Sequence, residues 1–122
     1  MEKVIVQKLK KEAPDVYSLA ELYVSLISAT NSLSLTKREI QLVAFTAIHG
    51  NISYNVNREE FCKRYSTSSP TINNMISKLK KIGILIKSSG KIKTHPLLVL
   101  DFNKDIILNI TLSHGQASLP LG

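Results

Sequence analysis

The sequence predicts an α+β fold in which a short helix, a tight turn and a longer helix lead directly into a two-stranded antiparallel hairpin. Residues 57–88 read NREEFCKRYSTSSPTINNMISKLKKIGILIKS, with two segments of helical apolar spacing on either side of a serine-rich turn. Gly83 ends the second segment, and an apolar run typical of a strand follows at once. Residues 57–94 hold nine basic and two acidic residues, a balance equal to the +7 net charge of the whole chain.

Length and composition are those of one globular domain. A chain of 122 residues with 43% hydrophobic residues can bury a core without metals or disulfides. We expect a single domain over residues 1–114 and a tail over residues 115–122. The one cysteine, Cys62, has no partner for a disulfide, and no apolar run approaches the ~20 residues that span a membrane. The first residues lack the features of a signal peptide, so we expect a cytoplasmic protein.

The first predicted helix covers residues 15–31. Asp15 is its expected N-cap, because its carboxylate can accept hydrogen bonds from the free amides of the first turn. The apolar residues that follow recur at the spacing of an amphipathic helix. Leu22 and Val24 lie outside this stripe, which indicates burial on a second side, against either a second subunit or the N-terminal residues. Residues 1–12 fit a short strand or the start of a helix.

The second predicted helix, over residues 37–49, has signals at both ends. Thr36 and Glu39 have the spacing of a capping box, in which each side chain accepts from the backbone amide of the other. Gly50 can adopt the left-handed conformation that ends a helix. The alternation of apolar and polar residues that follows predicts a short strand over residues 52–56.

Two further helices are predicted over residues 58–65 and 70–82. Asn57 is the expected N-cap of the first, and a serine-rich turn joins the two helices. Ser69 is the expected N-cap of the second, with Pro70 at the first helical position, where its missing N–H leaves no bond unmade. An apolar stripe predicts the buried side of this second helix: Ile72, Met75, Ile76, Leu79 and Ile82.

The predicted hairpin has strands over residues 84–86 and 92–100. Gly90 in its polar tip can adopt the positive φ of a tight turn. Pro96 cannot donate to a strand ladder, so we expect it at an edge or a bulge. A last strand is expected over residues 106–113, where apolar and polar residues alternate.

The order of helix, short strand, helix, helix and hairpin resembles the winged helix-turn-helix family. Bacterial regulators of the MarR and GntR kinds and some plasmid and phage replication initiators carry its pattern, and the His95–Pro96 step looks most like the replication initiators. The resemblance covers residues 36–102. It implies a winged helix-turn-helix with an extra N-terminal helix and an extra C-terminal strand. The residues that carry it are Ser69, Pro70, Thr71, Ile72, Ile76, Leu79, Lys81, Ile82, Gly83, Ile84 and Leu85.

The resemblance implies that the N-terminal half of helix 70–82 enters the major groove of double-stranded DNA. Asn73 or Asn74 has the amide that forms a bidentate pair with adenine, and the Thr71 methyl group can contact a thymine methyl. Further contacts, mainly to the DNA backbone, are expected from residues of the helix, the turn before it and the hairpin. These residues are Ser68, Ser69, Ser77, Lys78, Lys81, Lys87, Lys91 and Lys93.

The expected function is that of a double-stranded DNA-binding protein, either a transcriptional regulator or a replication accessory factor. Helix 70–82 has no arginine, the commonest reader of guanine, which argues against strong sequence specificity. The alternative is a structural or adaptor protein that uses the same module for protein contacts in a larger assembly. A replication complex or a phage particle is such an assembly. The DNA-binding function implies association with the nucleoid, whereas a role in a phage particle implies a location in the virion. A homo-oligomer formed through the N-terminal helix or the C-terminal strand fits either function.

Catalysis, cofactor binding and RNA binding have little support in the sequence. His49, His95 and His114 are scattered and have no metal-ligand spacing. No glycine-rich phosphate loop, nucleophile elbow or carboxylate pair occurs. The basic region lacks the aromatic platforms on which RNA bases stack. We therefore expect a protein that is not an enzyme and needs no metal or other cofactor.

Overall fold

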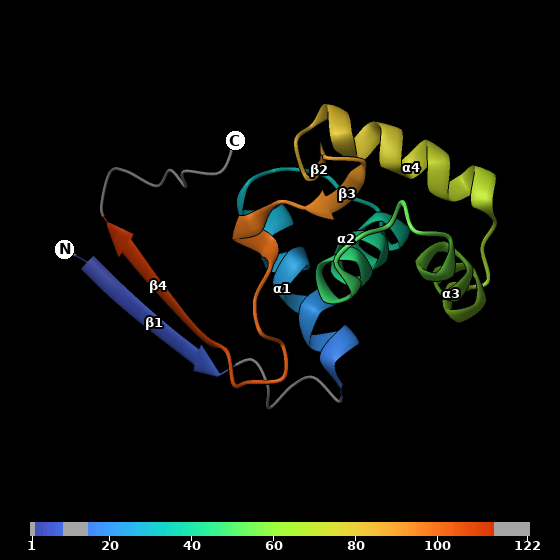
Figure 1. Cartoon of the computed structure of the whole chain (residues 1–122). Coiled ribbons are helices and arrows are strands. Elements are labelled where there is room, and N and C mark those ends of the chain that lie inside the picture. Colours follow the sequence, from blue (N-terminus) through green and yellow to red (C-terminus); the bar gives the residue numbers. More distant parts are fainter. Residues whose placement is uncertain (1, 9–14, 114–122) are drawn as a thin grey trace.

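The fold is α+β, with four α-helices and two separate two-stranded sheets in the described part of the chain (Figure 1). The structure, a computed structural model, describes residues 2–8 and 15–113. The helices are α1 (Val16–Thr30), α2 (Lys37–His49), α3 (Asn55–Tyr65), α4 (Ser69–Lys81) and the short 3-10 helix η2 (Pro96–Leu98). The strands are β1 (Glu2–Lys8), β2 (Leu85–Ser88), β3 (Lys91–Thr94) and β4 (Ile107–Ser113). β1 pairs with β4, and β2 with β3, both antiparallel.

The ends of α1 and α2 confirm the predicted caps. The Asp15 carboxylate accepts a hydrogen bond from the Ser18 amide at 2.8 Å, which fixes the start of α1. Thr36 and Glu39 form a complete capping box, with hydrogen bonds of 2.8 and 3.2 Å between the side chain of one and the amide of the other. Gly50 has a φ of 89° and ends α2.

One aromatic cluster joins α1, α2 and α3. Phe45 of α2 is fully buried, with the Phe61 ring of α3 edge-on at 5.3 Å and the His49 ring stacked at 4.0 Å between centroids. The Tyr17 hydroxyl of α1 lies 2.9 Å from Nε2 of His49. Val24 is also buried in this core, so packing within one chain accounts for part of the predicted second buried side of α1.

The strand predicted over residues 52–56 is wrong. Ile52 is buried, and its amide donates one hydrogen bond to the carbonyl of Ile92 in β3 at 3.0 Å, but the chain then turns away. Asn51 stabilises the turn, because its side-chain oxygen accepts from the amides of Ser53 and Ile92. The alternating pattern therefore reflects one buried residue followed by a turn.

The starts of α3 and α4 lie earlier than predicted. α3 begins at Asn55, and Asn57, the predicted N-cap, instead donates its side-chain amide to a carbonyl in the preceding turn at 2.7 Å. α4 is capped by Ser68 rather than by the predicted Ser69, so Pro70 occupies the second helical position. Proline is tolerated there because the amides of the first turn have no partner within the helix.

The β2–β3 hairpin is present with a shorter second strand than predicted. Ser89 and Gly90 at its tip have φ angles of 53° and 77°, the sign that a type I′ turn needs at both positions. β3 ends at Thr94, whose buried hydroxyl donates to the carbonyl of Val43 in α2 at 2.9 Å. The prediction of a strand to residue 100 is wrong, and so is an edge or bulge position for Pro96, which begins η2.

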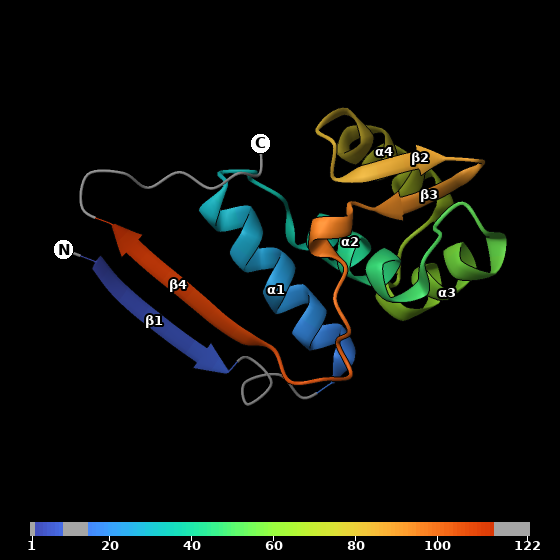
Figure 2. The ribbon, with the colours of Figure 1, turned by 60° about the vertical axis from the view of Figure 1, so that its left-hand side comes forward.

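β1 and β4 form a separate ribbon beside α1, far from α3 and α4 (Figures 1 and 2). Its register pairs Glu2 with Ser113 and Lys8 with Ile107. β4 confirms the predicted last strand, and β1 shows that the first residues form a strand rather than a helix. The tail predicted over residues 115–122 lies outside the described residues.

Candidate nucleic-acid interface

α4 presents one apolar face to the core and one polar face to solvent. Ile72, Met75, Ile76 and Leu79 are buried, as their helical spacing predicts, whereas Ile82 is exposed at the C-cap. The eleven residues that the sequence predicts for DNA binding are all exposed. The structure places them on α4, on the turn before it and on the β2–β3 hairpin, which packs beside α4 (Figure 2).

A bridge from α3 holds the N-terminal half of α4. The Arg58 guanidinium donates to Oδ1 of Asn73 and, through Nε, to the carbonyl of Ile52 at 2.9 Å. The side-chain oxygen of Asn73 is therefore engaged inside the protein. Asn74 is exposed, and within residues 15–113 no hydrogen bond occupies its amide. Of the two predicted adenine readers, Asn74 is the one that offers both a donor and an acceptor.

The first turn of α4 groups hydroxyls and backbone amides at one end of the helix. The Ser68 and Thr71 hydroxyls lie 3.0 Å apart, and the Ser68 side chain makes no cap hydrogen bond. The first bond within the helix runs from the Ile72 amide to the Ser68 carbonyl, so the amides of Ser69 and Thr71 precede it. This end of α4 has the partial positive charge that favours phosphate oxygens.

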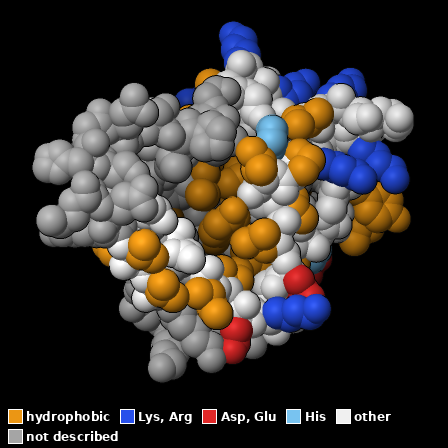
Figure 3. All heavy atoms as spheres, turned by 90° about the vertical axis from the view of Figure 1, so that its left-hand side faces the viewer, with side chains coloured by type: hydrophobic (Ala, Val, Ile, Leu, Met, Phe, Trp, Pro, Cys, Tyr) orange, Lys and Arg blue, Asp and Glu red, His pale blue; other side chains and the backbone are white. Residues whose placement is uncertain are grey.

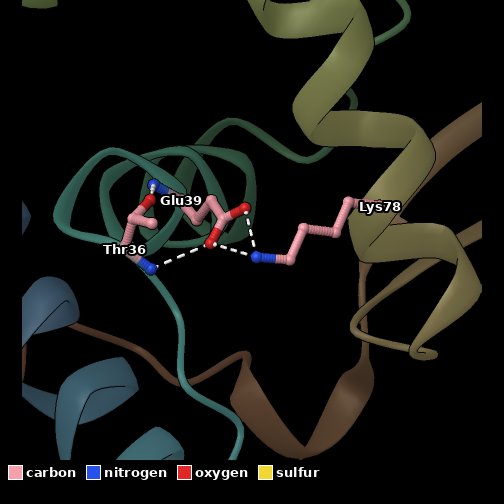
Figure 4. A network of polar contacts seen from close by, with 3 residues as sticks. All are labelled: Thr36, Glu39 and Lys78. Atoms are coloured by element: carbon pink, nitrogen blue, oxygen red, sulfur yellow. Dashed lines mark hydrogen bonds and ion pairs between the residues drawn. The ribbon is translucent and has the colours of Figure 1, made fainter.

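Lys78 is held against the body of the protein (Figure 4). Its ammonium group lies 2.9 and 3.0 Å from the two carboxylate oxygens of Glu39, which is only 5% exposed. The same carboxylate accepts from the amide of Thr36. Burial raises the pKa of Glu39, but the hydrogen bonds from Thr36 and Lys78 outweigh it and hold that pKa below its ordinary value of 4.5. The ion pair of Lys78 with Glu39 thus connects α4 to the start of α2. A DNA phosphate would have to compete with the Glu39 carboxylate for the Lys78 ammonium group.

Six lysines of the basic region are exposed and form no ion pair within the described part of the chain. Arg58 and Lys78 are engaged as described above, and the Arg64 guanidinium lies 3.7 Å from the centroid of the Tyr17 ring. The six remaining residues are Lys63, Lys80, Lys81, Lys87, Lys91 and Lys93. They continue from α3 across α4 to the hairpin, so positive charge extends over three neighbouring elements.

Lys63 and Lys80 are not among the residues that the sequence predicts for DNA binding. Lys63 lines a surface hollow of about 550 Å³ between α3 and the start of α4, together with Arg58 and Ser69. Both lysines are visible in the sequence as members of the basic region. The sequence pattern, however, gives no reason to add an α3 residue to the face of α4, because that proximity depends on how the two helices pack.

Other kinds of site have no counterpart in residues 2–8 and 15–113. No group of three His, Cys, Asp or Glu side chains there is arranged to hold a metal ion. None of the helices in those residues combines the length and the apolar character needed to cross a bilayer. Comparisons with protein-family models, with curated proteins and with solved structures find no match for this chain, so its function is inferred from its own residues.

Proposed function

We propose that this chain is a double-stranded DNA-binding protein of the winged helix-turn-helix kind, a transcriptional regulator or a replication accessory factor. The observation that carries the proposal is the run of six exposed lysines across α3, α4 and the β2–β3 hairpin, none of which forms an ion pair with the described residues. A basic face with few acids is the electrostatic footprint of a surface that binds a polyanion. The order of α2, α3, α4 and the hairpin is compatible with a winged helix.

In this proposal α4 enters the major groove by its N-terminal half. The amides of its first turn meet a phosphate, the Asn74 amide pairs with adenine, and the Thr71 methyl group contacts thymine. Phosphates flanking the groove are contacted by lysines of α4 and of the hairpin: Lys80, Lys81, Lys87, Lys91 and Lys93. Because lysine–phosphate contacts read no sequence, most of the affinity is electrostatic and the sequence preference is modest.

A binding titration on duplex DNA at several salt concentrations tests the proposal. With up to six phosphate contacts, the logarithm of the association constant should fall with the logarithm of salt concentration with a slope of about −3 to −5. Failure to bind at low salt, or an affinity that does not change with salt, would refute DNA binding by this face.

A pair of lysine variants assigns the binding to α4. Lys80→Ala combined with Lys81→Ala should weaken binding to every duplex on the order of tenfold and reduce the salt slope by about 2. The matched control combines Lys37→Ala with Lys104→Ala, two exposed lysines outside the basic region, and removes the same charge from the protein. Equal losses in the two double variants would mean that net charge, and not this face, attracts the DNA.

A second candidate function is that of a structural or adaptor protein in a larger assembly. The observation in its favour is the ribbon of β1 and β4, which exposes the large apolar side chains of Val4, Val6 and Ile107. Light scattering after size exclusion separates the two functions. A large closed oligomer that ignores DNA favours the adaptor, whereas a small species that binds DNA favours the first proposal.

A further inference from the structure

The ribbon of β1 and β4 exposes apolar side chains on both of its faces. Val4 and Val6 are 59% and 63% exposed, and Ile107, opposite Lys8 in the register, is 65% exposed on the same face. Ile5 points to the other face and is 49% exposed. Figure 3 views the molecule from this side, where hydrophobic side chains are exposed in the middle of the view and Lys and Arg side chains lie toward its top and right. A two-stranded ribbon alone is at best marginally stable in water.

β1 also has an edge without a partner strand in the described part of the chain. Among residues 2–8 and 15–113 its sheet contains β1 and β4 alone, so one side of β1 has no hydrogen-bonded neighbour strand there along its seven residues. Its sequence, EKVIVQK, contains no proline or glycine to interrupt pairing. Such an edge is a template for a strand of another chain.

We propose that two copies of this chain associate by antiparallel pairing of their β1 edges, with the two-fold axis at Ile5. In this register Ile5 lies opposite the partner's Ile5, and Val4 lies opposite the partner's Val6. At each end Glu2 lies opposite the partner's Lys8, so the charges of the two strands are complementary. Cross-strand pairs of β-branched residues and of opposite charges both stabilise an antiparallel pair of strands.

Other arrangements of the two edges fit less well. Parallel pairing in register sets Glu2 beside the partner's Glu2 and Lys8 beside the partner's Lys8, and like charges directly opposite each other are destabilising. Shifting the antiparallel register by two residues leaves both ends unpaired and separates the opposite charges. The sequence of β4, ILNITLS, is uncharged and supplies no complementarity of this kind at its own edge.

The two-fold pairing produces a four-stranded sheet in the order β4, β1, β1, β4. The exposed Val4 of each copy then contacts the partner's Val6 on one face, which removes apolar surface from water. The ribbon lies far from α4 and the hairpin, so the dimer leaves both basic faces accessible (Figures 1 and 2). The inference goes beyond the proposed function and does not depend on it, since it holds whether or not the chain binds DNA.

Charge-swapped variants test the register. Sedimentation equilibrium over a range of concentrations should give the mass of two chains for the unchanged protein. Lys8→Glu should weaken the dimer about tenfold or more, because Glu2 then faces a second carboxylate at both ends. The double variant Glu2→Lys with Lys8→Glu should restore the dimer. A protein that stays monomeric at all concentrations up to about 100 µM, or a double variant no tighter than Lys8→Glu, overturns the proposal.

A disulfide provides a second measurement that identifies the edge. In a Cys62→Ser background, Ile5→Cys places one thiol on each side of the two-fold axis, and mild oxidation should link two chains. Thr111→Cys is the matched control on β4, since Thr111 is also exposed. A disulfide between two chains at residue 111 but not at residue 5 would show that the β4 edges pair in place of the β1 edges. If neither variant forms a disulfide between chains, the proposed edge pairing is refuted.

Discussion

Glu39 acts in two ways, as the third residue of a helix cap and as the partner of a lysine distant in the chain. Its carboxylate accepts from the Thr36 amide and pairs with the Lys78 ammonium from a nearly buried position. The first contact is local and could be predicted from the spacing of Thr36 and Glu39. The second could not, because it depends on where α4 packs against α2.

Replacing Glu39 by glutamine should lower the free energy of unfolding by about 1–2 kcal/mol at pH 7. Glutamine can still accept from the Thr36 amide, but it cannot neutralise Lys78, so the loss measures the ion pair. Urea unfolding monitored by circular dichroism gives the value. Glu59→Gln, an exposed carboxylate of α3, is the control and should change stability by less than about 0.5 kcal/mol.

The same carboxylate should make stability depend on pH. Its pKa in the folded state is lower than its ordinary value of 4.5, so Glu39 stabilises the protein above that pH. The stabilisation is lost as the pH falls through the lower folded pKa. The difference between wild type and Glu39→Gln should therefore shrink between about pH 5 and pH 3. A difference that stays constant over this range would mean that Glu39 does not titrate in the way described.

At the scale of single elements, helices could be located from the sequence better than strand ends. Asp15, Thr36 and Gly50 act through contacts within a few residues, so their effects appear in the sequence. The turn at Asn51 depends on a hydrogen bond from the distant Ile92 amide. The strand β3 ends at Thr94 because Pro96, two residues later, begins η2. Most lysines of the candidate interface could be predicted from charge and helical position, whereas the place of Lys63 beside α4 and the engagement of Asn73 by Arg58 could not.

The tip of the β2–β3 hairpin offers a test of element stability. Ser89 occupies a position with a φ of 53°, which asparagine tolerates better, so Ser89→Asn should raise the free energy of unfolding by about 0.5 kcal/mol. Gly90→Ala should lower it by about 1 kcal/mol, because alanine is strained at positive φ. Apart from the neighbouring residues of the chain, no atom lies within 4 Å of the added methyl group, so the loss of stability would come from backbone strain and not from a steric clash. Thermal unfolding of both variants measures it, and an unchanged Gly90→Ala protein would contradict the turn.

At the scale of the whole molecule, the exposed lysines of the basic region and the exposed apolar side chains of the β1–β4 ribbon lie on different sides. The six exposed lysines follow α3, α4 and the hairpin, whereas the β1–β4 ribbon lies beyond α1 (Figure 1). This separation could not be predicted, because residues 2–8 fit both a strand and a helix until β4 supplies a partner. The close contacts of β1 and β4, among the described residues, are almost all with each other.

Hydrogen exchange should show this division as a difference in protection. In a dilute sample of monomers, the amides of β1 and β4 should exchange faster than those of α2, because few core contacts hold the ribbon. At concentrations that favour the proposed dimer, exchange of the β1 amides should slow selectively. Mass spectrometry of peptides at both concentrations measures the change. Equal protection of the ribbon and α2 in the monomer would contradict the weak attachment of the ribbon.

The pairing of β1 with β4 also constrains the order in which the chain folds. Glu2 pairs with Ser113, so the ribbon closes a loop that contains all four helices. Closing a flexible loop of about 100 residues costs about 4 kcal/mol of chain entropy, far more than closing the β2–β3 turn. The helices therefore fold first and bring the two strands within reach of each other. Until then β1 is an unpaired strand, and at high concentration it can meet β4 of a neighbouring chain before its own, which is the route to an exchanged dimer.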